Sequence, residues 1–415
     1  MRFYIETYGC TANQGNSEEA SAALMEEGHQ PSALEDADLV IVNTCVVTER
    51  TERNMIKRLR QLQGDRLVIA GCLPVAIPEA IQGIRCRGKL GILGRSAGRE
   101  IDELFPTGAM ARPATSPRCR VLASRDHLCG VVNISEGCTG NCSYCIVKKA
   151  RGRLVSRSPE EVIEAVRRCI ESGAVEVQIA SQDAAAYGMD IGYSLPWLLD
   201  RIVQIPGRYR VRVGMMNPGS LEPILDDLVR SYGDPRIYNF VHLPVQSGSD
   251  DVLERMKRRY KAADFVNMAA RLRQGIFDLT LFTDVIAGFP GETEEEFGET
   301  VRLIQSVRPD KVNVTRFSPR PYTEAGRLGE LPSLVKKERS RKLTWLWHEI
   351  AAQRNWRYVG EVLSVLVTES GKGKTVKARS DSYREIVIDG QLALGSVQKV
   401  RIAEANPFYL RGTVE

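Results

Sequence analysis

Short apolar runs alternate with amphipathic stretches over the first hundred residues. We expect strands at 3–7, 39–42 and 67–70, and helices at 17–27 and 48–62, where apolar residues recur with a helical period. Strands that alternate with helices at such spacings are typical of βαβ units. The pattern therefore predicts an N-terminal α/β domain with a parallel sheet over residues 1–103.

The same alternation resumes after a proline-containing stretch at 104–128, which we interpret as a linker. Six strands are expected, at 131–135, 176–180, 210–214, 240–245, 280–287 and 311–316. Five helices are expected between them, at 159–171, 195–204, 220–229, 262–274 and 294–306. Six such repeats predict a partial (β/α)6 barrel over 129–332, a fold type whose chemistry lies where the strands end.

The pattern changes twice more toward the end of the chain. Residues 333–359 form a basic helical connector that carries Trp345, Trp347 and Trp356. Cations beside aromatic rings suit RNA, whereas a solvated helix with its tryptophans packed on the barrel is the alternative. Period-two patterning over 360–415, broken by glycines, predicts five short strands in a small OB-like β-barrel. The lysines and arginine expected to contact phosphate there are Lys372, Lys374, Lys377 and Arg379.

The amino-acid composition indicates which class of protein this is. The 415 residues are 43% hydrophobic and 26% charged, as in soluble globular proteins, and the net charge of +5 permits a nucleic-acid partner. No apolar run is long enough to cross a bilayer, so we expect no membrane association. Ten cysteines without a secretory signal favour thiols that bind metal over a disulfide framework. These features predict a cytoplasmic protein.

Three cysteines, Cys138, Cys142 and Cys145, follow the first expected barrel strand with C-x3-C-x2-C spacing and no histidine nearby. They can hold three irons of a [4Fe–4S] cluster and leave the fourth iron open, whereas electron-transfer clusters use four cysteines. A zinc knuckle is the alternative, but zinc sites favour paired cysteines completed by a second pair or by histidines. This spacing resembles that of radical S-adenosylmethionine (SAM) enzymes. The resemblance implies that SAM binds the open iron and is reductively cleaved to a 5′-deoxyadenosyl radical.

Three further cysteines, Cys10, Cys45 and Cys72, each follow an expected N-terminal strand. Because parallel strands end at one edge of a sheet, where open α/β sheets bind ligands, we expect the three thiols to meet there. Unrelated buried cysteines are the alternative, but they would not recur at the same position after three strands. Cys169 lies within an expected helix and is predicted to be core.

Four polar residues are candidate SAM contacts at the same end of the barrel. Gln182 and Asp183 follow the second expected strand, Arg212 lies in the third and Gln246 follows the fourth. Gln182 or Asp183 could hold the SAM amine or ribose, and Arg212 its carboxylate. Ordinary turn and cap chemistry is the alternative for each residue taken alone.

Taken in order, these parts resemble the radical SAM methylthiotransferases, which have an N-terminal cluster domain, a radical SAM barrel and a C-terminal TRAM domain. The motifs are Thr7-Tyr8-Gly9-Cys10, Asn43-Thr44-Cys45, Gly71-Cys72 and Gly137 through Cys145. The resemblance implies two [4Fe–4S] clusters, an auxiliary one on Cys10, Cys45 and Cys72 and a SAM-binding one on Cys138, Cys142 and Cys145. It also implies two uses of SAM, as methyl donor and as radical source.

Segments after Cys145, such as 149–154, 185–192 and 213–218, resemble the archaeal and eukaryotic branch of the family. That branch installs a methylthio group at C2 of N6-threonylcarbamoyladenosine 37 of tRNA, so the expected partners are the anticodon arm of tRNA and an electron-donor protein. Methylthiolation of isopentenyladenosine in tRNA or of a ribosomal-protein aspartate is the close alternative. A non-catalytic Fe–S RNA-binding protein is the alternative from another class.

Overall fold

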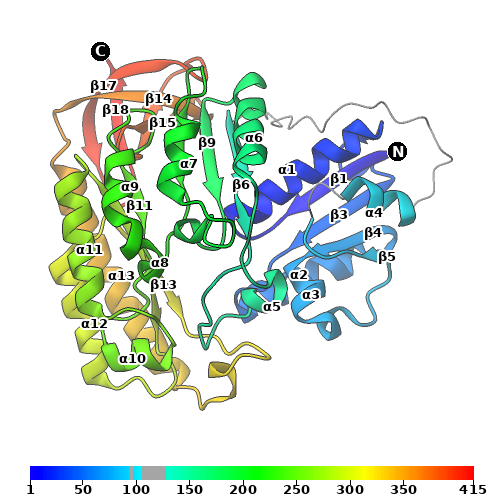
Figure 1. The fold of residues 1–415 in the computed structure, drawn as a ribbon, viewed down its shortest axis with the longest axis horizontal. Helices are drawn as coiled ribbons and strands as arrows, with labels where there is room; N and C mark the ends of the chain where they lie inside the picture. The colour runs from blue at the N-terminus through cyan, green and yellow to red at the C-terminus, as the bar shows by residue number, and fades with distance from the viewer. Residues whose placement is uncertain (94–96, 105–127) are drawn as a thin grey trace.

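The computed structural model describes residues 1–93, 97–104 and 128–415. It has mixed α/β architecture, with an N-terminal sheet, a barrel of parallel strands and a small β-barrel (Figure 1). The predicted linker at 104–128 falls almost wholly outside the described residues. The predicted fold class is confirmed.

The N-terminal sheet has five parallel strands in the order β2-β1-β3-β4-β5. Its strands are β1 (Arg2–Thr7), β2 (Gln30–Pro31), β3 (Leu39–Thr44), β4 (Gly64–Gly71) and β5 (Cys86–Lys89). Its helices are α1 (Thr11–Glu26), α2 (Glu49–Leu62), α3 (Cys72–Ala76) and α4 (Ala97–Leu104), with a 3-10 turn at Pro78–Ile81. Leu39 and Ile41 pack with α1 and α4, whereas Val40 and Val42 pack with α2 and α3. Burial on both faces explains the uninterrupted apolar run of β3.

Helix α1 begins at Thr11, earlier than the predicted start at residue 17. The small residues of its first turns pack directly on the barrel strand β6 (Cys129–Asn133). A Cβ atom on Gly15 would lie 2.9 Å from Val131 Cγ1, so the two elements approach as closely as backbones allow. This tertiary contact favours a helix where local composition is polar.

The barrel contains the six predicted strands. They are β6, β9 (Glu176–Ala180), β10 (Arg210–Val213), β11 (Phe240–His242), β12 (Thr280–Ala287) and β13 (Lys311–Arg316). They form two three-stranded parallel sheets. Isolated β-bridges join the two sheets where β10 lies next to β11. The helices are α5 (Val147–Arg151), α6 (Pro159–Glu171), α7 (Leu195–Ile202), α8 (Pro218–Leu221), α9 (Leu225–Ser231), α10 (Asp250–Arg255), α11 (Ala262–Gly275) and α12 (Glu294–Val307). Strands β7 (Ser135–Glu136) and β8 (Val155–Ser156) pair as a short ribbon. Cys169 is fully buried in the barrel core, as predicted.

Helix α13 (Ser333–Trp356) leads into a closed barrel with strand order β14-β15-β16-β18-β17. The strands are β14 (Val362–Ser370), β15 (Thr375–Ser380), β16 (Glu385–Asp389), β17 (Val397–Ala405) and β18 (Leu410–Val414). The β15–β16 turn docks on the end of the large barrel at which its strands begin: Tyr383 donates to Glu176 Oε1 at 2.9 Å. Arg384 Nη2 donates to Asp310 Oδ1 at 2.6 Å. The small barrel therefore lies at the amino ends of the large barrel's strands.

Three of the six lysines and arginines of α13 form ion pairs within the protein: Lys336 with Glu330, Arg339 with Glu292 and Glu294, and Arg354 with Asp310. Arg357, the residue after the helix, pairs with Asp278. The Trp347 indole donates to the Asp310 carbonyl at 3.0 Å, whereas Trp345 and Trp356 are exposed. No helix of the described residues has the length and apolar character that crossing a membrane requires.

Candidate metal centres

The loop that follows β6 and β7 carries Cys138, Cys142 and Cys145 at the carboxyl face of the barrel, the end at which its parallel strands finish. The backbone N–H of Gly140 donates to Cys138 Sγ at 3.2 Å. A Cβ on Gly140 would lie 3.3 Å from Cys138 Sγ and 3.7 Å from Cys142 Sγ, so the loop wraps closely around two of the thiols. Hydrogen bonds to cysteine sulfur are a feature that tunes iron–sulfur sites.

Arg258, from the segment after α10, binds the same loop. Its Nη1 donates to Cys142 Sγ at 3.1 Å and its Nη2 donates to Asn217 Oδ1 at 3.1 Å. Tyr260 accepts from Arg258 Nε at 2.9 Å and itself donates to the Val245 carbonyl at 2.8 Å. A fixed cation thus joins a cysteine of the loop to the ends of β10 and β11.

The other triad is assembled from three separate strand ends. Cys10 precedes α1, Cys45 follows β3 and Cys72 begins α3, directly after β4. Cys45 and Cys72 are buried and Cys10 is exposed. A Cβ on Gly9 would lie 2.9 Å from Cys45 Cβ, which shows that the Cys10 loop and the Cys45 loop are in contact.

Side chains of the N-terminal domain hold these three loops together. Asn13 Nδ2 donates to the Tyr8 carbonyl at 2.7 Å and to the Thr44 carbonyl at 3.1 Å. Thr44 Oγ1 donates to the Ala70 carbonyl at 2.6 Å and accepts from Leu73 N at 3.1 Å. The polar residues next to each cysteine therefore fix its loop against the next one.

Arg151, the last residue of α5, connects the two triads. Its helix begins two residues after Cys145, and its side chain is 1% exposed. Its Nη2 donates to Asn13 Oδ1 at 2.6 Å and to Asn16 Oδ1 at 2.9 Å, while its Nη1 pairs with Glu136. Its positive charge also lowers the pKa of the Cys72 thiol, against the effect of burial. The Arg151 side chain, which comes from the segment after the Cys138–Cys145 triad, thus lies in the N-terminal domain beside the other triad.

Burial favours the protonated form of several of these thiols, and nearby donors and cations oppose that effect. Burial raises the pKa of the Cys72 thiol to about 11, and the charge of Arg151 opposes that rise. Burial also raises the pKa values of Cys45, Cys138 and Cys145. Within the described residues no group of three His, Cys, Asp or Glu side chains is arranged to hold a single metal ion. Cysteine thiols with N–H donors and cations beside their sulfur atoms are the kind of ligands that an iron–sulfur cluster has.

The four predicted SAM contacts have different surroundings. Gln182 Oε1 accepts from Gly137 N at 2.7 Å, directly beside the cysteine loop. Asp183 is buried and accepts from Asn217 N at 2.9 Å and from Ser220 Oγ at 2.8 Å, and burial raises its pKa to about 6. Gln246 has a left-handed backbone with φ of 69° at the end of β11. Arg212 lies with its guanidinium 5.6 Å from the Tyr383 ring, toward the small barrel. None of these contacts tests a SAM role, and each role stays a prediction.

Sequence analysis missed Arg151 and Arg258 as site residues. Arg258 stands in the run Lys257-Arg258-Arg259, which is typical of a solvated surface. Arg151 was noted only as part of a branch-like segment. Their position beside buried thiols depends on contacts between residues far apart in the chain, which a charge pattern does not reveal.

Three protein families match successive parts of the chain. UPF0004 matches residues 2–87, the radical SAM superfamily matches residues 132–304, and the TRAM domain matches residues 357–414. The first two ranges include the two cysteine triads. Among solved structures, the radical S-adenosylmethionine methyltransferase TsrM from Kitasatospora setae is similar, with a TM-score of 0.58. It is 16% identical, over 78% of this chain and 74% of that one, so the likeness concerns the fold alone.

Relatives match over nearly the full length. The probable threonylcarbamoyladenosine tRNA methylthiotransferase of Archaeoglobus fulgidus is 42% identical over 99% of this chain and 98% of its own. The threonylcarbamoyladenosine tRNA methylthiotransferase of Drosophila melanogaster is 35% identical over 100% of this chain and 78% of its own. The chain therefore belongs to the threonylcarbamoyladenosine tRNA methylthiotransferase family of radical SAM proteins.

Proposed function

We propose that this chain inserts a methylthio group at C2 of N6-threonylcarbamoyladenosine 37 of tRNA, with two [4Fe–4S] clusters and two SAM-dependent steps. An aromatic C–H bond has no acidic proton, so its replacement needs radical chemistry of the kind a cofactor supplies. The observation that carries the proposal is the position of Arg151, which ends the helix after Cys145 and donates to Asn13 and Asn16 in the helix after Cys10, so it ties the segment after one triad to the other triad.

In this proposal Cys138, Cys142 and Cys145 hold the SAM-binding cluster, and Cys10, Cys45 and Cys72 hold the auxiliary one. When bound, the first supplies the electron that cleaves SAM and the second an open iron for the sulfur to be transferred. The Gly140 N–H favours the anionic form of the Cys138 sulfur, and the Arg258 guanidinium places a positive charge beside the Cys142 sulfur. The charge of Arg151 lowers the pKa of Cys72, and its side chain donates to Asn13 and Asn16 of α1.

Gln182 is the candidate SAM contact that is hydrogen-bonded to the segment beside the cysteine loop, and Gln246, which follows β11, is a second candidate in this proposal. Asp183 would act by positioning Asn217, to whose N–H it is already bonded. Arg212 remains a candidate for the SAM carboxylate. Substitution of each residue by Ala, followed by SAM binding measured by calorimetry, separates these roles.

We also infer that the anticodon arm is the part of tRNA bound, that a cytoplasmic electron-donor protein supplies reducing equivalents, and that the chain acts in the cytoplasm.

The decisive experiment is mass spectrometry of nucleosides from threonylcarbamoylated tRNA after anaerobic incubation with reconstituted protein, SAM and a reductant. We expect a methylthio-threonylcarbamoyladenosine peak that requires every component. If 5′-deoxyadenosine forms but the methylthio nucleoside does not, the protein is a radical SAM enzyme with a different substrate. tRNA without the threonylcarbamoyl group is the matched control and should remain unmodified.

A further inference from the structure

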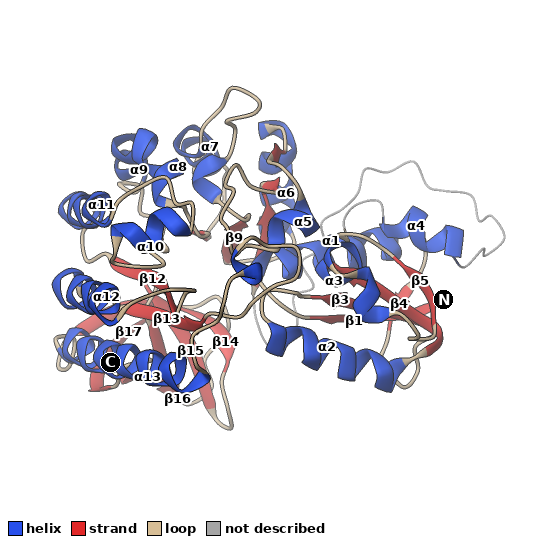
Figure 2. Cartoon of the chain, turned by 90° about the horizontal axis from the view of Figure 1, so that it is seen from below, coloured by secondary structure: helices blue, strands red, loops and turns tan. Residues whose placement is uncertain are grey.

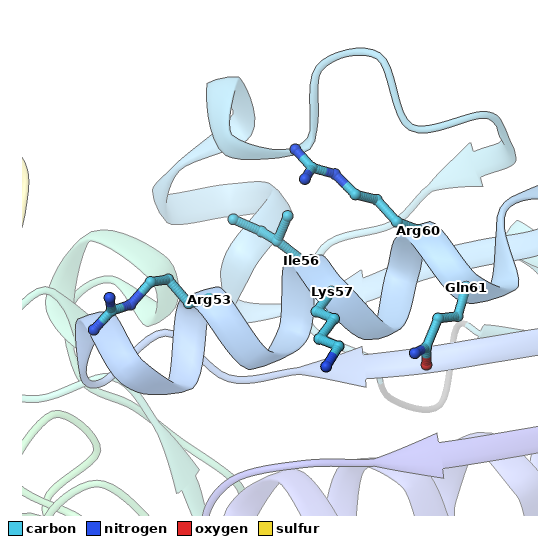
Figure 3. Close-up of a pocket in the computed structure, with 5 residues that line it drawn as sticks. All are labelled: Arg53, Ile56, Lys57, Arg60 and Gln61. Carbon is cyan, nitrogen blue, oxygen red and sulfur yellow. The ribbon is translucent and has the colours of Figure 1, made fainter.

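Four basic residues follow one face of α2. Arg50, Arg53, Lys57 and Arg60 recur at steps of three, four and three residues, which places them along one side of a helix, and all four are exposed. We call these four residues the α2 stripe. Figure 3 shows three of its members, Arg53, Lys57 and Arg60, projecting from the helix beside Ile56 and Gln61, with which they line a shallow surface depression.

Acidic side chains do not neutralise the α2 stripe. Glu52 pairs with Arg320 and Glu6 pairs with Arg58, which lies outside the stripe. Glu49 is 3.8 Å from Arg53, and both side chains are more than half exposed, so water and salt weaken that pair. Among the described residues, Arg50, Lys57 and Arg60 have no ion-pair partner. The stripe therefore presents net positive charge to solvent.

The α2 stripe begins beside the carboxyl face of the barrel. Glu49 N donates to Ser318 Oγ at 3.1 Å, and Arg320 pairs with Glu52. Ser318 and Arg320 follow β13, so they lie at the face that carries the Cys138 loop. From that contact α2 extends outward along the N-terminal domain (Figure 2).

The basic residues of the small barrel differ from the α2 stripe in pairing or in position. Lys377 and Arg379 of the small barrel both pair with Glu369 and Glu385. The small barrel also docks at the amino ends of the barrel strands, away from the cysteine loop. The α2 stripe combines unpaired cations with a position next to the face where the predicted chemistry occurs.

We propose that the α2 stripe binds the sugar-phosphate backbone of the substrate tRNA next to the modified nucleotide; this inference rests on the proposed function. At 1.5 Å per residue, the stripe spans about 15 Å, enough to follow several consecutive phosphates. Arginine and lysine side chains that neutralise phosphates release counterions, which makes such binding favourable and dependent on salt.

The test compares tRNA binding by the reconstituted wild-type protein and by the variant R50Q/R53Q/K57Q/R60Q, over a range of salt concentrations. We expect the variant to bind about 10- to 100-fold more weakly, with the slope of log affinity against log salt reduced by about two to four. The charge-retaining variant R50K/R53K/R60K should bind within about threefold of wild type, because phosphate attraction needs charge rather than a particular geometry. Cluster absorbance and the melting temperature confirm that each variant is folded.

The control removes the same number of exposed cations at the other end of the barrel, in the variant R201Q/R208Q/R230Q/R271Q; two of them, Arg230 and Arg271, pair with Asp227 and Asp226. Near wild-type affinity of this control, together with weak binding by the stripe variant, supports the proposal. Equal losses in both variants would mean that only net charge matters and would overturn it. Unchanged binding by the stripe variant would also overturn it, while the proposed function would stand if the wild type still modifies tRNA. A wild type that binds no tRNA would overturn both.

Discussion

The two cysteine triads differ in how the fold brings their thiols together. Cys138, Cys142 and Cys145 lie in one loop, so a short stretch of sequence sets their separation. Cys10, Cys45 and Cys72 are brought together only by a parallel sheet and by the side chains that tie its loops. A local site can form wherever its loop is held, whereas the second site requires its whole domain to be folded. The predictions below test this difference.

The largest effect is expected from Cys142→Ala. The variant loses the thiol that accepts from Arg258, and with it one of the three proposed cluster ligands. We expect no 5′-deoxyadenosine and no methylthio nucleoside, both measured by chromatography and mass spectrometry. Retained SAM cleavage would contradict the assignment of this triad to SAM.

Cys45→Ala should separate the two triads. We expect 5′-deoxyadenosine to form while sulfur insertion stops, because Cys45 lies in the N-terminal sheet and not in the Cys138 loop. Bound iron should fall by about half. Loss of both products from a folded variant would show that the sites do not work separately.

Arg151→Ala tests the connection between the triads. Removal of this buried cation leaves Glu136, Asn13 and Asn16 without their partner, and such a loss typically costs about 3 to 5 kcal/mol. We expect weaker retention of the iron held by the N-terminal triad, seen in its electron paramagnetic resonance signal, and an intermediate effect for Arg151→Lys. An unchanged signal in both variants would argue that Arg151 is not needed there.

Two glycines offer a matched pair, one at each triad. Gly71 has φ of 92°, and a Cβ would lie 2.4 Å from Asn43 Oδ1 and 2.6 Å from the Thr44 carbonyl. Gly71→Ala should therefore lower the free energy of unfolding by about 2 to 4 kcal/mol. Gly140→Ala meets Cys138 Sγ at 3.3 Å and Cys142 Sγ at 3.7 Å, without a backbone clash, and should cost less than about 1 kcal/mol. Thermal unfolding compares them, and equal costs would remove the contrast between the two sites.

The smallest effect concerns Glu18, which accepts from Val131 N at 3.1 Å where α1 meets β6. Burial raises its pKa to about 7 from the usual 4.5. The native state then holds a proton that the unfolded chain has lost, so stability should fall as pH rises from about 4.5 to 7. Glu18→Gln should remove this dependence and stabilise the protein by about 1 to 3 kcal/mol at pH 8, measured by denaturation at pH 5 and pH 8. A pH-independent wild type would contradict it.

Periodicity predicted the order and type of most elements, since each barrel strand falls on or within two residues of an apolar run that was identified from sequence. It missed the first turns of α1, whose small polar residues form a helix because they pack on β6. The cysteines were predictable because thiol spacing and strand ends are visible in sequence. Arg151 and Arg258 were not, because their role depends on where distant segments fold.

Asp310 has a further consequence for how the chain matures. It precedes the last barrel strand, yet its buried carboxylate is neutralised by Arg354 and Arg384, which emerge from the ribosome well after that strand. Until these arginines are made, a nascent barrel carries an unpaired charge in its interior, which is strongly destabilising. The barrel therefore becomes stable only after the C-terminal segment has been synthesised. A chain whose synthesis stops before that segment should be recognised by chaperones and proteases.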